Sequence, residues 1–158
     1  EKSVEFIQAD FLNLDYGELG LERDSSASLV GNIPYGITGK ILKRAVAGRD
    51  FFSKAVFTIQ KEVADRVLAD LGTKDCGAIT YFIKAYAEVT RLADIPPSAF
   101  YPSPEVDSSI IEIVFAPEKR FESRDEVCQN NYSNQLETAH HNNQYCTSKA
   151  EPQDGYWG

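Results

Sequence analysis

The residues of this chain best suited to chemistry are the four consecutive residues Asn32, Ile33, Pro34 and Tyr35, which directly follow the strand-like segment 28–30. In open α/β sheets, ligands bind beyond the carboxyl ends of the strands. A strand that ends in this tetrapeptide would therefore offer an amide, a rigid turn and an aromatic ring to a cleft.

These residue types suit methyl transfer to the exocyclic amine of adenine, a weak nucleophile that has to be aimed. The side-chain oxygen of Asn32 and the backbone carbonyl of Ile33 can accept the two amine hydrogens, and the ring of Tyr35 can stack on the base. Pro34 would fix the turn that exposes the carbonyl. The same four residues also fit an ordinary turn after a strand, with Tyr35 covering an apolar edge.

Two further positions could contribute to such a site. Asp10 follows the strand-like segment 4–7 and can accept a hydrogen bond from a cofactor amine, although Asp is also a common turn former. Phe100 lies in the proline-rich loop 95–108, and a ring on a stiff loop is a good stacking platform because it need not be ordered at binding. Its alternative role is that of a plug in the core.

The elements that would position these residues can be read from apolar periodicity. Short blocks rich in β-branched or aromatic residues predict strands at 4–7, 27–30, 55–59 and 108–115. Apolar residues at helical spacing predict helices from Thr38 to near Gly48, at 62–71 and at 78–87. This alternation predicts an α/β fold with a mostly parallel sheet covered by helices on both faces. The last strand follows a proline-rich loop and is expected to be antiparallel, at or near an edge.

Composition sets further bounds. The apolar content of 42% predicts a soluble domain with a core, and the absence of a long apolar run or a leader sequence indicates a cytoplasmic protein without a membrane span. The three Cys are expected to be free thiols. A net charge of -8 argues against simple electrostatic capture of nucleic acid.

The composition changes after Val127. Residues 128–158 contain no Val, Ile or Phe and hold most of the Asn, which predicts a polar, disordered tail behind a domain at 1–127. Cys128, His140, His141 and Cys146 lie in this tail at spacings that fit no short zinc motif, so no metal site is expected.

The motifs occur in an order that resembles the catalytic domain of KsgA-type small-subunit ribosomal RNA adenine dimethyltransferases. The resemblance runs from about Val4 to Phe115 and rests on Ala9-Asp10-Phe11, Gly31-Asn32-Ile33-Pro34-Tyr35, the segment 60–66, the segment 72–77 and the segment 96–108. The tetrapeptide alone is shared by many amino-group methyltransferases of nucleic acids, whereas the full series is more specific.

The resemblance implies a Rossmann-like class I methyltransferase sheet, S-adenosyl-L-methionine as cofactor, and a monomer that dimethylates two adjacent adenines of small-subunit rRNA in the immature small ribosomal subunit. By position it implies cofactor contacts at Asp10, Phe11 and Asn32, the target amine at residues 32–35, and the target base between Tyr35 and Phe100. Expected RNA contacts are Lys40, Lys43, Arg44, Lys61 and Arg66. The first three can equally form the solvated face of a helix.

The chain also departs from the family. The glycine-rich cofactor loop and the ribose-binding acid lie upstream of the matching region, so an isolated fragment entered midway is expected to be inactive. The segment after residue 120 does not match the family's helical C-terminal domain, and Glu105 stands where the family usually has Lys. The alternatives are a large-subunit rRNA methyltransferase of the macrolide-resistance type and a non-catalytic RNA-binding or ribosome-assembly factor.

Overall fold

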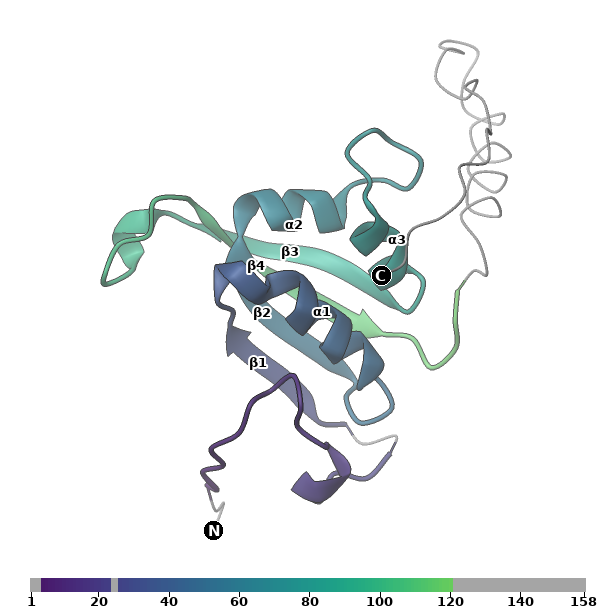
Figure 1. Cartoon of the computed structure of the whole chain (residues 1–158). Helices are drawn as coiled ribbons and strands as arrows, with labels where there is room; N and C mark the ends of the chain where they lie inside the picture. The colour runs from purple at the N-terminus through teal and green to yellow at the C-terminus, as the bar shows by residue number, and fades with distance from the viewer. Residues whose placement is uncertain (1–3, 24–25, 121–158) are drawn as a thin grey trace, which may run out of the picture.

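A four-stranded sheet forms the centre of the computed structural model, which describes residues 4–23 and 26–120 (Figure 1). The strands lie in the order β1-β2-β4-β3. Their bounds are Ser28–Asn32 for β1, Lys54–Gln60 for β2, Ala87–Ile95 for β3 and Ser108–Phe115 for β4. The expected domain boundary at 127 and the expected tail at 128–158, with its Cys and His residues, lie outside the described residues.

Three of the four strands, β1, β2 and β3, point the same way, as the sequence predicts. Strands β1 and β2 are parallel, whereas β4 is antiparallel to both β2 and β3. The reason that β4 is reversed is its connection: no α-helix lies between β3 and β4, and the chain turns back through the proline-rich loop, which joins antiparallel neighbours. The antiparallel direction predicted for β4 is confirmed, and so is its position near an edge, because it lies beside the edge strand β3.

All three predicted helices are present. They are α1 at Thr38–Ala47, α2 at Lys61–Leu68 and α3 at Ala78–Lys84. The second is shorter than predicted because Lys84 Nζ donates to the carbonyls of Leu68 and Ala69, at 3.0 and 2.7 Å, and so closes the C-terminal end of α2. The third is shorter because the chain enters β3 at Ala87. No helix in the described part of the chain is long and apolar enough to cross a membrane.

The helices cover one face of the sheet (Figure 1). On β2, Ala55, Phe57 and Ile59 are buried against the helices, while the intervening residues are partly exposed. On the opposite face Val30 is 78% exposed, and no described helix packs there. The expectation of helices on both faces is therefore wrong for the described residues.

Two strand predictions also need correction. Residues 4–7 form no strand, and Phe6 is 93% exposed, because no described strand lies beside them to accept their backbone hydrogen bonds. Strand β3, in contrast, is not among the strands that the sequence predicts. Its inward positions carry Ala87, Val89 and Arg91 among polar residues, so the strand has no apolar block.

The segment before β1 is held to the domain by Tyr16, which is buried. Its ring meets Phe52 edge-on at 4.9 Å between centroids, and the Arg44 guanidinium lies 4.5 Å from its centroid. Burial raises the pKa of the Tyr16 hydroxyl, and the positive charge of Arg44 partly offsets that shift. Cys76 is a free thiol, as predicted.

Candidate functional site

One edge of the sheet gathers the segments singled out by sequence. The carboxyl ends of β1, β2 and β3 and the first residue of β4 share this edge, because Ser108 pairs with both Gln60 and Ile95. Residues 32–35 and the proline-rich loop therefore leave the sheet on the same side, where the loop extends beyond the strands (Figure 1). This is the position at which α/β sheets bind ligands.

Residues 32–35 are placed by a combination of sheet pairing and burial. The N–H of Ile33 donates to the carbonyl of Thr58 at 2.9 Å, and its side chain is buried in the core. The side chain of Asn32 is exposed and holds no hydrogen bond among the described residues. Asn32 is thus fixed through its backbone while its amide stays available to a ligand.

Thr38 organises the carbonyls that follow. Its buried hydroxyl donates to the carbonyls of Pro34 and Tyr35, each at 3.2 Å. Within the part of the chain that the structure describes, the carbonyl of Ile33 receives no hydrogen bond. The turn therefore leaves one backbone acceptor next to the free Asn32 amide, which is the pair that the sequence reasoning required.

The ring of Tyr35 is tethered at its far end. Tyr35 Oη and Ser108 Oγ lie 2.7 Å apart and share a hydrogen bond that spans 73 residues of sequence. Tyr35 is half-buried and Ser108 is fully buried. The sequence reasoning missed Ser108, because a contact so distant in sequence leaves no local signal.

Phe100 is half-buried at the end of the 3-10 turn η3, Pro97–Ala99. The loop is braced by Ser103 Oγ, which donates to the carbonyl of Pro97 at 2.9 Å. Phe100 belongs neither to the buried core nor to the partly buried residues packed against it. This placement disfavours a role as a core plug and is compatible with a stacking surface.

The two residues expected at the cofactor make local contacts. The carboxylate of Asp10 accepts hydrogen bonds from the N–H of Leu12 at 3.0 Å and from the amide of Asn13 at 2.9 Å, which is the turn-forming role. Asp10 remains exposed, and each oxygen keeps a further lone pair. Phe11 is half-buried and packs against the core.

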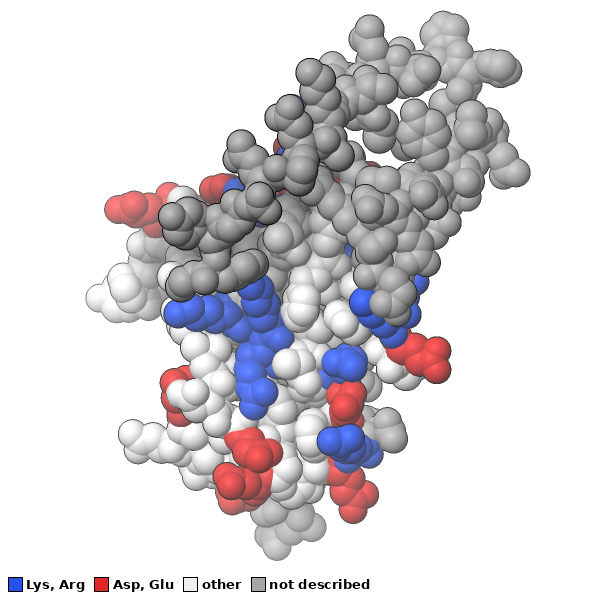
Figure 2. Space-filling model, turned by 45° about the vertical axis from the view of Figure 1, so that its right-hand side comes forward, with Lys and Arg blue, Asp and Glu red and all other residues white. Residues whose placement is uncertain are grey.

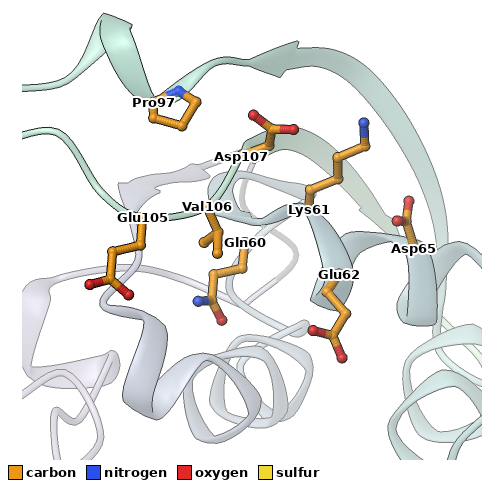
Figure 3. Close-up of a pocket in the computed structure, with 8 residues that line it drawn as sticks. All are labelled: Gln60, Lys61, Glu62, Asp65, Pro97, Glu105, Val106 and Asp107. Carbon is orange, nitrogen blue, oxygen red and sulfur yellow. The ribbon is translucent and has the colours of Figure 1, made fainter.

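A cavity of about 430 Å³ lies at the same edge, between the start of α2 and the proline-rich loop (Figure 3). Its lining residues are Gln60, Lys61, Glu62, Asp65, Pro97, Glu105, Val106 and Asp107. Four carboxylates against one ammonium repel phosphate. An RNA backbone is therefore not expected to pass through this cavity, and Glu105 adds to that repulsion.

Several of the residues expected at RNA are engaged within the protein. Lys61 Nζ lies 3.7 Å from Asp94 Oδ2, and Arg66 pairs with Glu62 at 3.3 Å. Arg44 donates to the carbonyl of Leu14 in addition to its contact with Tyr16. Lys40 and Lys43 on α1 are exposed.

Asp94 was also missed by sequence. It accepts a hydrogen bond from the buried Ser109 Oγ at 2.5 Å and faces both Arg91 and Lys61. The hydrogen bond from Ser109, aided by the two cations, lowers the pKa of the Asp94 carboxyl. Arg91 also pairs with Asp65, so this network of charged and hydroxyl side chains around Asp94 links α2, β3 and β4 beside the cavity.

No group of three or more His, Cys, Asp or Glu among residues 4–23 and 26–120 is placed to hold a metal ion. A family model described as ribosomal RNA adenine dimethylase matches residues 1–136. The chain belongs to the ribosomal RNA adenine dimethylase family. The family named by the sequence resemblance is thereby confirmed.

Curated relatives in this family are named ribosomal RNA small subunit methyltransferase A. The protein of Geobacter metallireducens is 37% identical over 112 residues, which cover 70% of this chain and 41% of the relative. The protein of Xanthomonas euvesicatoria is 38% identical and shares 71% of this chain and 42% of its own length. The chain thus spans about two fifths of the relatives it matches.

Solved structures of a dimethyladenosine transferase and of a 23S rRNA methyltransferase share the fold. A dimethyladenosine transferase from Plasmodium falciparum superposes with a TM-score of 0.54 and 32% identity over 56% of this chain and 33% of its own. The 23S rRNA methyltransferase ErmE gives 0.59 over 83% of this chain and 49% of its own, at 24% identity, which supports the fold alone. The predicted methyltransferase-like α/β architecture with flanking helices is confirmed.

Proposed function

We propose that this chain is the base-binding part of an S-adenosylmethionine-dependent rRNA adenine dimethyltransferase. The observation that carries the proposal is the pair of acceptors at the end of β1, the exposed Asn32 amide and the Ile33 carbonyl, which receive no hydrogen bond from the described residues and lie beside the tethered ring of Tyr35. Names of the relatives and the family description support the same activity.

The two acceptors would hold the two hydrogens of the adenine amine, so that its lone pair points away from them. S-Adenosylmethionine, when bound, supplies the methyl group that this lone pair attacks. The methylated nitrogen then loses one proton to solvent, so one hydrogen remains, and a single acceptor is enough to hold it for the second transfer. Tyr35 on one side and Phe100 on the other would stack on the base.

The cofactor would be held in part by Asp10, Phe11 and Asn32. Asp10 can offer its remaining lone pairs, but its turn already uses one lone pair of each oxygen. The described residues thus supply few contacts for a cofactor, and binding by this chain alone is expected to be weak.

The proposed substrate is small-subunit rRNA in the immature small ribosomal subunit, and the relatives' names support that choice. A monomer is the simplest arrangement, since one chain presents the whole acceptor pair. The proposed location is the cytoplasm. Large-subunit rRNA remains the alternative substrate, with only a shared fold behind it.

The test is capture of the target base by the 158-residue chain. RNA hairpins copied from small-subunit rRNA would carry two adjacent adenines, with either adenine or an abasic site at the target position. Stacking is worth about 1–3 kcal/mol per base, so adenine should bind at least about fivefold more tightly. Equal affinity for the two hairpins would refute the proposal, and tighter binding of large-subunit hairpins would select the alternative substrate.

A further inference from the structure

We infer that Ser108 is a positioning residue that fixes the Tyr35 ring for stacking on the target adenine. The inference rests on the proposed function, because it assigns Ser108 a role through Tyr35. It starts from the 2.7 Å contact between Tyr35 Oη and Ser108 Oγ, which joins the base-binding turn to a different strand.

The position of Ser108 is fixed by burial and by strand pairing on both sides. It is the first residue of β4 and is fully buried, with Gln60 of β2 on one side and Ile95 of β3 on the other. A hydroxyl on a paired central strand has a fixed origin. Its hydrogen bond therefore restricts the partner rather than following it.

Tyr35 is fixed at both ends by this arrangement. Its backbone carbonyl accepts from Thr38 Oγ1 at 3.2 Å, and its hydroxyl is bound to Ser108. Tyr35 is held at its backbone carbonyl and at its side-chain hydroxyl, so its ring has little rotational freedom left to lose when a base stacks on it. Preorganisation of this kind raises affinity for the base without any new contact.

The neighbouring Ser109 provides a matched control. It is equally buried, but it points to the other face of β4 and donates to Asp94 Oδ1 at 2.5 Å. Ser108→Ala and Ser109→Ala each remove one buried hydroxyl from adjacent positions of the same strand. Only the first removes the partner of Tyr35.

The experiment measures the ratio of affinities for the adenine and abasic hairpins in a double-mutant cycle. Ser108→Ala should lower this ratio about two- to tenfold, the equivalent of one hydrogen bond, and Ser108→Thr should restore it. In a Tyr35→Phe background, which has no hydroxyl, Ser108→Ala should cause no further loss. Ser109→Ala should leave the ratio unchanged.

A second readout needs no RNA. In chain labelled with 3-fluorotyrosine, the fluorine signal of Tyr35, assigned with Tyr35→Phe, should shift and broaden in Ser108→Ala and return in Ser108→Thr. An adenine preference that Ser108→Ala leaves intact, or lowers equally in the Tyr35→Phe background, would overturn the role of Ser108. Absence of adenine preference in the wild-type chain would instead overturn the proposed function, and the role of Ser108 with it, whatever the fluorine signal shows.

Discussion

The side chain and N–H of Ile33 anchor the turn, while its carbonyl is left to accept a hydrogen bond. Its side chain is buried and its N–H pairs with Thr58, so the backbone is fixed, while its carbonyl is left without a partner in the described structure. A carbonyl without a protein partner, beside an exposed Asn, can accept a hydrogen bond from water or from a ligand. That arrangement favours a binding role for residues 32 and 33.

The first prediction tests the acceptor pair. Asn32→Ala should lower the preference of the chain for adenine over purine, which lacks the amine, by about two- to tenfold, since one hydrogen bond is removed. Melting temperature should not change, because the Asn32 side chain is exposed and unbonded. Paired fluorescence titrations measure the effect, with one hairpin that carries adenine and one that carries purine at the target position. A variant that keeps its discrimination would return residues 32–35 to the role of a turn.

The second prediction separates stacking from packing at Phe100. Because this ring lies outside the core, Phe100→Ala should reduce adenine affinity by about 1–3 kcal/mol. A buried Phe would instead cost about 3–5 kcal/mol of folding free energy. Denaturant unfolding and hairpin titration on the same variant decide the matter: a large loss of stability with normal adenine affinity contradicts the stacking role.

At the scale of single residues, the sequence pointed to candidate site residues but not to the side-chain contacts that they make. Asn32 is exposed and Phe100 lies outside the core, which is compatible with the roles expected for them, and those roles stay predictions. Ser108 and Asp94 could not be found that way, since each acquires its role from a residue on another element. Side-chain contacts across a sheet depend on register, which local patterns do not specify.

Helix α2 and strands β3 and β4 are joined by charge as well as by packing. The Asp94 carboxylate accepts a hydrogen bond from Ser109 and faces Arg91 and Lys61. The junction of α2, β3 and β4 beside the cavity therefore depends on one ionised carboxylate. Strand β3 escaped detection for a related reason. Its polar positions are satisfied by partners on neighbouring elements, and the strand therefore lacks the apolar block by which the other strands were recognised.

The third prediction concerns acid. The pKa of Asp94 is lowered in the folded chain, so its stabilising contribution is present above the ordinary carboxyl pKa of about 3.9 and is lost as the pH falls through the lower folded value. Asp94→Asn should melt earlier than wild type at neutral pH, and the two melting curves should converge in acid. Asp75→Asn, an exposed Asp without an ion pair in the described structure, is the control. Parallel curves for Asp94→Asn and wild type at all pH values would contradict the role of the network.

The fourth prediction concerns the junction of α1 with the preceding segment. A Cβ at Gly48 would lie 2.9 Å from Tyr16 Cδ2 and still nearer to Cε2, so Gly48→Ala should lower the free energy of unfolding by about 1–3 kcal/mol. Gly39→Ala, in the same helix with nothing within 4 Å, should be neutral or stabilising. Chemical denaturation of both variants measures the difference, and equal stabilities would mean that Tyr16 does not pack there in solution.

For the molecule as a whole, the sequence predicted the α/β class, the helices and their order, because each helix carries its own apolar stripe. It did not predict how strands pair or which face of the sheet is covered. Periodicity of two marks a strand but gives neither its direction nor its neighbour. The absence of a helix from the described face that bears Val30 is likewise a property of the assembled sheet.

Charge is also a property of the whole. On the face shown in Figure 2, basic side chains gather near the middle and acidic side chains lie towards the sides and below them, while the net charge of the chain is -8. Of the five cations expected at RNA, Arg44, Lys61 and Arg66 already have partners within the protein. The two that remain, Lys40 and Lys43, are exposed on α1, the helix that begins three residues after Tyr35. Phosphates flanking a base at Tyr35 would be within reach of this helix.

The last prediction follows from that count. With two phosphate contacts and about 0.7 counterions released for each on single-stranded RNA, the logarithm of affinity should fall against the logarithm of salt with a slope of about -1.4. Lys40→Gln with Lys43→Gln should bring the slope close to zero, whereas Lys54→Gln, which removes a lysine paired with Glu112 at 3.3 Å, should leave it unchanged. Anisotropy titrations of a labelled hairpin over a series of salt concentrations measure the slope. A wild-type slope steeper than about -3 would require four or more phosphate contacts, so cations other than Lys40 and Lys43 would have to bind RNA.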